Sequence, residues 1–152
     1  MVMLKRSLCL VLIVFTLLFI GIIPTILADA GTPIVQIGNV TGSAGSEVTV
    51  PVTISTIPPE WVSLDLILEF DTNVLEVISV NNGDVFSSST RNFSNDTGKV
   101  LVAAATDFPI TSGSTLIEIV FKIKETAKLG ESQLIQEELI LGDSSFEPIP
   151  VT

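Results

Sequence analysis

Apolar and polar residues alternate along much of this chain, and a period of two is typical of β-strands that bury one face. The clearest runs are 48–54, 63–70 and 117–124, in which every second residue is apolar. Further strands are predicted at 34–40, 74–80, 90–94, 99–105 and 134–141. No segment shows a convincing helical period, and 125–131 is predicted to be a loop or at most one helical turn because Gly130 interrupts it.

Clusters of turn-forming residues separate these runs, for example Ile57-Pro58-Pro59 and Asn95-Asp96-Thr97-Gly98. Short strands at this spacing favour an all-β fold, a two-sheet antiparallel β-sandwich of eight or nine strands with jelly-roll-like architecture. Pro51 occupies one of the alternate positions in the first run and is compatible with an edge strand. The residues predicted to face the core are Val50, Val52, Leu64, Leu66, Leu68, Ile117, Ile119 and Phe121.

The first thirty residues have the pattern of a signal peptide. Lys5 and Arg6 precede an apolar run at 8–23, Pro24 ends this run, and Ala28-Asp29-Ala30 supplies a cleavage site after Ala30. Residues 1–30 are therefore predicted to be removed, which leaves 31–152 as one extracellular, secreted or cell-surface domain. The alternative is an uncleaved anchor, since the apolar run approaches the length that spans a bilayer.

Composition restricts the chemistry available to the predicted mature domain. The chain has a net charge of −10 and no histidine, and Cys9 lies in the signal segment. Nucleic acid is a poor partner for such an acidic domain, and after signal cleavage no membrane association is expected. Without histidine or a mature cysteine, ordinary nucleophilic triads and zinc sites are excluded, so no catalytic residue, metal or cofactor is predicted. Carboxylates such as Asp65, Glu69, Asp107 and Glu118 are interpreted as surface charge rather than as a glycosidase pair.

Three segments resemble the cohesin family, whose modules hold dockerin-bearing enzymes on scaffold proteins. Residues 42–52, GSAGSEVTVPV, are similar to the family's opening strand. Residues 69–77, EFDTNVLEV, resemble its aromatic-Asp-Pro-x-Val-Leu-Glu-Val signature, with Thr72 in place of proline. Residues 113–123, GSTLIEIVFKI, resemble a later strand. The resemblance implies a non-catalytic sandwich that binds a dockerin-like helical module in a polysaccharide-degrading or surface assembly.

One departure concerns the end of the chain. The family ends in a Gly-x-Val-x-Val strand beside the first strand, whereas this sequence ends at Ile149-Pro150-Val151-Thr152. Residues 31–152 are therefore interpreted as a cohesin-like domain truncated before its last strand, with one unpaired edge on the 34–40 strand.

The alternation predicts a partner-binding face. If the even-numbered residues of 64–70 point inward, then Ser63, Asp65, Ile67 and Glu69 point outward, with Ile67 in the middle of a polar row. In 99–105, an inward Val100, Val102 and Ala104 leave Leu101, Ala103 and Ala105 outside. The resemblance places the family's dockerin contacts on these two strands, at Ser63, Asp65, Leu101 and Ala103.

Asp71 and Asn73 follow the second alternating run and are predicted to shape a turn rather than bind a ligand.

The rival function is carbohydrate binding, because secreted sandwiches bind polysaccharide on exposed aromatic rings. Trp61 is the candidate platform, although it is equally suited to closing the end of the core. Three N-glycosylation motifs, at Asn39, Asn92 and Asn95, predict exposed loops or strand ends.

Overall fold

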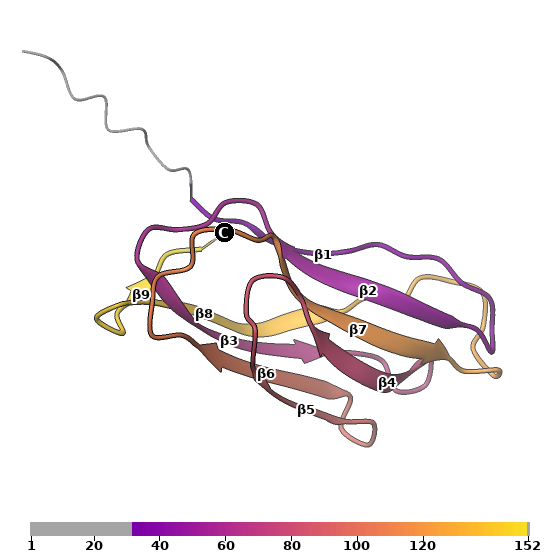
Figure 1. Ribbon diagram of the computed structural model, residues 1–152. Helices are drawn as coiled ribbons and strands as arrows, with labels where there is room; N and C mark the ends of the chain where they lie inside the picture. Colours follow the sequence, from indigo (N-terminus) through magenta and orange to yellow (C-terminus); the bar gives the residue numbers. More distant parts are fainter. Residues whose placement is uncertain (1–31, 152) are drawn as a thin grey trace, which may run out of the picture.

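The computed structural model describes residues 32–151, which form nine β-strands and, within that range, no helix. They build one sheet of order β1-β2-β7-β4 and a second of order β5-β6-β3-β8-β9, with all neighbouring strands antiparallel (Figure 1). This confirms the predicted antiparallel β-sandwich. The strands are β1 (Val35–Ile37), β2 (Glu47–Ile54), β3 (Trp61–Glu69), β4 (Leu75–Asn82), β5 (Thr90–Ser94), β6 (Lys99–Ala105), β7 (Thr115–Ile123), β8 (Ile135–Asp143) and β9 (Pro148–Ile149).

The described range has no helix of the length and apolarity needed to cross a membrane. The predicted signal peptide at 1–30 lies outside the described residues.

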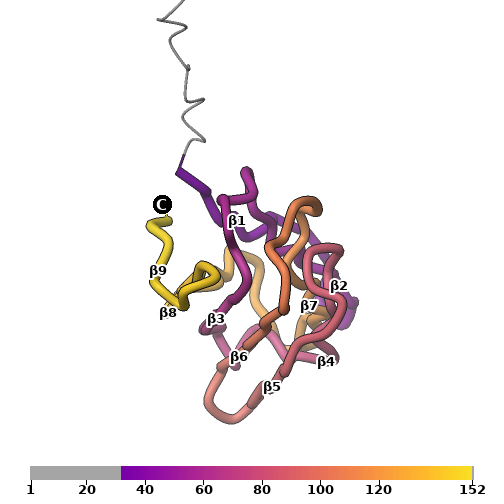
Figure 2. The backbone as a smooth tube through the Cα atoms, turned by 60° about the vertical axis from the view of Figure 1, so that its left-hand side comes forward, coloured from indigo at the N-terminus to yellow at the C-terminus, as the bar shows by residue number. Residues whose placement is uncertain are grey.

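The core fills the space between the sheets, and the turned view of Figure 2 separates β2, β7 and β4 from β3, β6 and β5. Every second residue of β3 and β6 is buried, as period-two alternation requires. Phe70 packs edge-on against Phe121 with a centroid distance of 5.3 Å, and Trp61 packs against Phe86 in the same manner at 5.3 Å. All eight residues predicted to face the core belong to this buried cluster.

Pro51 lies in an internal strand, which corrects the expectation that it marks an edge. β2 pairs with β1 on one side and with β7 on the other. The Pro51 carbonyl accepts a hydrogen bond from the Gly38 N–H at 2.8 Å, so the imide nitrogen also points toward β1. Because proline has no N–H to donate, the ladder between β1 and β2 ends beside it, and β1 stops at Ile37. β1 itself is an edge strand, as expected.

Asp71 and Asn73 form the predicted turn between β3 and β4. The Asp71 carboxylate accepts hydrogen bonds from the Asn73 backbone N–H at 2.8 Å and from the Asn73 side-chain amide at 2.9 Å. The Asp71 carbonyl accepts the Leu75 N–H at 2.9 Å. These contacts are local, so both residues serve the turn.

Asn95 departs from the prediction that all three glycosylation motifs lie in exposed positions. Its side-chain oxygen accepts a hydrogen bond from the Val77 N–H at 2.8 Å, and its side-chain nitrogen donates one to the Val77 carbonyl at 3.1 Å. These two bonds replace the backbone hydrogen bonds that a neighbouring strand would make to Val77. The amide therefore joins the β5–β6 turn to β4 in the opposite sheet and is only partly exposed. Asn39 and Asn92 are exposed as predicted. Gly98 closes the same turn with a φ of 69°, a backbone conformation that favours glycine.

Most strand boundaries lie within two residues of the predicted ones, but β1 covers only Val35–Ile37 of the predicted 34–40. β5 and β6 have the predicted limits, whereas β3 begins two residues earlier, at Trp61, and β8 continues to Asp143. The short strand β9 was not predicted. It follows a turn in which the Asp143 carboxylate accepts the N–H groups of Ser145 and Glu147. Residues 125–131 form a loop.

Candidate functional site

The solvent side of the five-stranded sheet carries the residues that the sequence pointed to. We call this surface the outer face and define it by nine residues that β3, β6 and β8 direct away from the core: Ser63, Asp65, Ile67, Glu69, Leu101, Ala103, Ala105, Glu138 and Ile140. Strands β6, β3 and β8 are adjacent in the sheet, so their outward side chains form one continuous surface.

The register of β3 and β6 brings the predicted partner residues together. Ile67 lies directly opposite Leu101, and Asp65 lies opposite Ala103. Leu101 is 41% exposed although it is a large apolar residue in the centre of a strand. The two strands therefore present an apolar centre beside a carboxylate, with Ser63 and Ala105 paired toward one end.

β8 contributes a third row that the sequence did not reveal. Ile140 lies opposite Asp65 and Glu138 opposite Ile67, on the side of β3 away from β6. Ile140 is 41% exposed, so the apolar surface continues across three strands. Leu139 and Leu141 point toward the core instead.

A β-bulge explains why the β8 row was missed. The register between β3 and β8 shifts between Ile67 and Leu68, which pair with Glu138 and Gln136, so Glu137 is the extra residue. A bulge breaks period-two alternation, and three consecutive polar residues at 136–138 gave no signal for which of them face outward. The apolar Ile140 between two core leucines was the available signal.

An ion pair spans the end of the outer face. The Lys99 ammonium on β6 donates a hydrogen bond to the Glu137 carboxylate on β8 at 2.6 Å, across the intervening strand that carries Glu69. This hydrogen bond lowers the pKa of Glu137 and raises the pKa of Lys99. Both groups consequently stay charged around neutral pH.

Asp65 differs from these paired charges. Its carboxylate is exposed and has no hydrogen bond or ion pair to another residue in the range 32–151. Asp65 lies between Ala103 of β6 and Ile140 of β8, so the centre of the outer face combines an anion without a partner among these residues with apolar neighbours.

Gly142 shapes the other end of the face. It pairs with Ser63, and a Cβ atom at position 142 would collide with the Ser63 hydroxyl. The absence of a side chain here keeps the surface flat around Ser63.

Trp61 does not provide an exposed aromatic ring, so its assignment as a sugar platform is corrected. The residue is 0% exposed, its indole packs edge-on against Phe86, and its Nε1–H donates to the Ser63 carbonyl. An apolar ring at the start of β3 gains more by closing the end of the core than by facing solvent. Trp61 instead closes the end of the core, which is the other role that the sequence suggested for it.

No grouping of three or more histidine, cysteine or carboxylate side chains suited to a metal ion occurs within the described part of the chain.

A family model, described as the cohesin domain, matches residues 33–152. The chain belongs to the cohesin family. Cellulosomal-scaffolding protein A of Acetivibrio thermocellus is 38% identical over 80 residues, which cover 52% of this chain and 4% of that protein. Cellulose-binding protein A of Clostridium cellulovorans is 35% identical over 111 residues, or 66% of this chain and 6% of that protein. This cohesin chain therefore spans less than a tenth of the length of either relative.

Solved cohesins have the same fold. A cohesin of Clostridium acetobutylicum superposes with a TM-score of 0.71 at 26% identity, covering 79% of this chain and 84% of that one. A type I cohesin–dockerin complex from Clostridium thermocellum gives 0.73 at 22% identity, with 80% and 94% covered. A non-cellulosomal cohesin from the archaeon Archaeoglobus fulgidus gives 0.69 at 23% identity, with 80% and 86% covered. The sandwich is thus shared among cohesins of low sequence identity.

Proposed function

We propose that residues 32–151 act as a non-catalytic adaptor that binds a dockerin-like helical module through the outer face. The observation that carries this proposal is the apolar centre formed by Ile67, Leu101 and Ile140 on three adjacent strands, in which Leu101 and Ile140 are each 41% exposed. Large exposed apolar patches on a soluble domain are typical of interaction sites. The solved relative from Clostridium thermocellum, described as a cohesin–dockerin complex, supports the choice of partner class.

The chemistry of the outer face suits an amphipathic helix. Leu101 and Ala103 offer aliphatic contacts with little side-chain bulk, so a helix can approach the sheet closely. Asp65 has no partner within the described residues and is available to accept hydrogen bonds from hydroxyl or basic side chains. Ser63 and Glu69 lie at the two ends of the β3 row, and Glu138 lies beside Ile67, so polar side chains border the apolar centre.

The test is titration calorimetry with dockerin modules from the same organism, using wild type and the variant Leu101→Asp. A carboxylate in the apolar centre would be desolvated without a partner on binding, so we expect affinity to fall at least about thirtyfold. Asp65→Ala should weaken binding by a smaller factor, since it removes one charged acceptor, which lies between Ala103 and Ile140.

The matched control is Thr49→Asp, an exposed position at the middle of the four-stranded sheet. This variant introduces the same charge on the opposite side of the sandwich and should bind as wild type does. Retained binding by a folded Leu101→Asp would show that the outer face is not the site. Absence of binding by wild type to every dockerin tested would reject the partner class.

We also propose that the domain is exported and works outside the cell or at the cell surface, within a polysaccharide-degrading or surface assembly. This rests on the signal-peptide pattern of residues 1–30, and the scaffolding, cellulose-binding and anchoring names of the relatives support it. Mass spectrometry of the secreted protein should give an N-terminus at Gly31. Recovery of the intact chain from Met1 in a membrane fraction would favour the anchor instead.

A further inference from the structure

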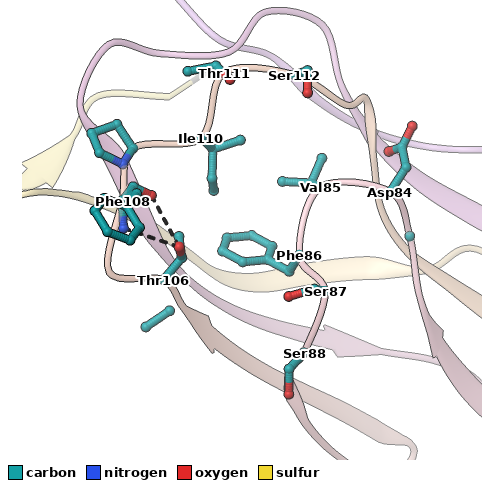
Figure 3. A pocket seen from close by; sticks show the side chains of 13 residues that line it. Asp84, Val85, Phe86, Ser87, Ser88, Thr106, Phe108, Ile110, Thr111 and Ser112 are labelled. Carbon is teal, nitrogen blue, oxygen red and sulfur yellow. Dashed lines mark hydrogen bonds between the residues drawn. The ribbon is translucent and has the colours of Figure 1, made fainter.

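A pocket separate from the centre of the outer face opens between two loops that connect the sheets. It lies between residues 83–88, which follow β4, and residues 105–112, which begin at the last residue of β6 (Figure 3). Its volume is about 340 Å³. That volume falls at the lower end of the range usual for small-molecule sites. Only Ala105 belongs both to the pocket and to the outer face.

The base of the pocket is apolar and rigid. Val85, Phe86 and Ile110 direct their side chains into the space between the loops (Figure 3). Phe86 is buried and packs against Trp61 of the core. The Ile110 N–H donates to the Trp61 carbonyl at 2.8 Å, which attaches the second loop to β3. The base is therefore formed before any ligand arrives.

Hydroxyl groups line the rest of the pocket. Within residues 32–151 the hydroxyls of Ser87, Thr111 and Ser112 form no hydrogen bond, so they are free to donate and accept. The Asn82 side chain accepts from the Ser89 hydroxyl at 2.7 Å and donates to the Ser87 carbonyl at 3.1 Å, which holds the first loop in place. The Ser87 hydroxyl is thus presented by an ordered loop.

An exposed aromatic ring stands at the rim. Phe108 is 78% exposed, although a phenyl ring gains by burial. The Thr106 hydroxyl donates to the Phe108 carbonyl at 3.1 Å and accepts the Phe108 N–H at 3.3 Å, as the dashed lines in Figure 3 show. This double contact fixes the backbone of Phe108 beside the pocket.

The charge of the lining narrows the ligand class. Among residues 32–151, no basic side chain lines the pocket, and Asp84 is the only ionisable group that does. One Asp84 carboxylate oxygen accepts the N–H groups of Ser114 at 2.9 Å and Thr115 at 2.6 Å. The bond from the Ser114 N–H lowers the pKa of Asp84 most, and the bond from the Thr115 N–H lowers it further. A negative charge therefore persists at the edge of the pocket. An anionic ligand would meet the Asp84 carboxylate and no cation among these lining residues, since Arg91 bonds Asn82 and Ser89 outside the lining.

We propose that this pocket binds a single neutral pyranose unit of a sugar. A pyranose has an apolar C–H face that can stack on the Phe108 ring and a set of hydroxyls that can pair with Ser87, Thr111 and Ser112. Trp61, the candidate sugar platform in the sequence, is buried. It contacts Phe86, which forms part of the base of the pocket. The pocket and the outer face are separate sites, so this proposal does not depend on dockerin binding.

The experiment is a titration followed by amide chemical shifts, with methyl β-D-glucopyranoside, methyl β-D-xylopyranoside and glucuronate as probes. At least one neutral pyranoside should shift the amides of residues 83–88 and 105–112 with a dissociation constant of about 1–10 mM, the range expected for one small contact surface. Glucuronate should bind more weakly than methyl β-D-glucopyranoside because of its carboxylate.

Phe108→Ala is the decisive variant, because removal of an exposed ring does not disturb the core. We expect it to weaken pyranoside binding roughly five- to tenfold. The matched control is Phe146→Ala, since Phe146 is also 78% exposed but lies in the β8–β9 turn outside the pocket. Leu101→Asp should leave pyranoside binding unchanged. The proposal is overturned by any one of four results: no shift at 50 mM probe (about five times the upper end of the expected range), shifts confined to another region, equal binding by Phe108→Ala and wild type, or preference for glucuronate.

Discussion

The two outward surfaces of the sandwich are built by the same alternation, yet they differ in what they expose. On the four-stranded sheet, Val120 in the centre of β7 lies between Thr49 of β2 and Ser79 of β4. On the five-stranded sheet, Ile67 in the centre of β3 lies between Leu101 of β6 and Glu138 of β8, with Ile140 and Ala103 one step away.

Charge follows the same division. Lys122 on β7 is placed between Glu47 and Glu76, so opposite charges are mixed across the four-stranded sheet. On the five-stranded sheet Lys99 pairs with Glu137 at one end, and Asp65 stays unpaired within the described residues. On the four-stranded sheet Ile78 is 44% exposed, but it lies at the bulge of the edge strand β4, and polar side chains flank Val120 in the centre. The five-stranded sheet instead has an apolar centre bordered by polar side chains, as interfaces do.

The largest effect that this contrast predicts is a difference in dockerin affinity between two variants, each of which lacks the central apolar side chain of one surface. Ile67→Ala should weaken dockerin binding by about 1–2 kcal/mol, or roughly five- to thirtyfold, because Ile67 fills the middle of the proposed interface. Val120→Ala, at the equivalent place on the opposite sheet, should leave binding unchanged. Titration calorimetry measures both values.

Stability measurements separate binding from folding in the same pair of variants. Ile67 and Val120 are both partly exposed, so each truncation should lower the free energy of unfolding by less than about 1 kcal/mol. Equal loss of affinity in the two variants would contradict the assignment of function to one face.

The fold could be predicted from the sequence because its signals are local. Alternation in 63–70 and 99–105 requires only that one face be buried, and Asp71 and Asn73 stabilise their turn through contacts two to four residues away. Pro51 was misplaced because the order of strands is not a local property. Nothing near Pro51 in the sequence indicates that β1 ends beside it.

The site was predicted where alternation was unbroken and missed where it failed. Both neighbouring rows, on β3 and β6, follow from a regular period of two, and their pairing in the structure brings Ile67 and Leu101 together. The β8 row was hidden because the bulge at Glu137 changes the phase of the pattern. Trp61 was ambiguous because a tryptophan at a strand end can close the core or face solvent, and only its packing on Phe86 decides.

An effect of comparable size, on stability instead of binding, is expected from the Asn95 side-chain amide that joins the β5–β6 turn to β4. Asn95→Ala removes both hydrogen bonds to the Val77 backbone and leaves a partly buried N–H and C=O without partners, so stability should fall by about 1–3 kcal/mol. Chemical denaturation measures this loss. Asn92→Ala is the control, since Asn92 is an exposed asparagine three residues earlier that bonds only the adjacent Phe93 N–H among the described residues.

Asn95 lies in the turn between β5 and β6 and bonds β4 of the other sheet, so it contacts none of the residues that define the outer face. We expect Asn95→Ala to leave dockerin affinity close to that of wild type at temperatures where the domain is folded. A stability loss in Asn92→Ala as large as that in Asn95→Ala would show that the Val77 contacts are not the cause.

The smallest effect concerns one lysine on each surface. Lys99→Gln removes the cation among the acidic groups Asp65, Glu69, Glu137 and Glu138, so the local charge of four carboxylates and one ammonium changes from −3 to −4. A partner with basic side chains should then associate a few-fold faster at low salt. Lys122→Gln changes the net charge equally but on the opposite sheet, about one Debye length away at 0.1 M salt, and should alter the rate less.

Stability should hardly respond to Lys99→Gln, because exposed ion pairs contribute little. The pKa of Glu137 is lower in the folded state, so its contribution is present above the unfolded pKa and is lost as the pH falls through the folded pKa. The pKa of Lys99 is raised, so its contribution is present below the unfolded pKa and is lost as the pH rises through the folded pKa. The small stability difference between wild type and Lys99→Gln should therefore be constant around neutral pH and vanish at both extremes. Stopped-flow association rates and denaturation at several pH values test both statements, and identical salt dependence for Lys99→Gln and Lys122→Gln would show that the two surfaces are electrostatically equivalent for the partner.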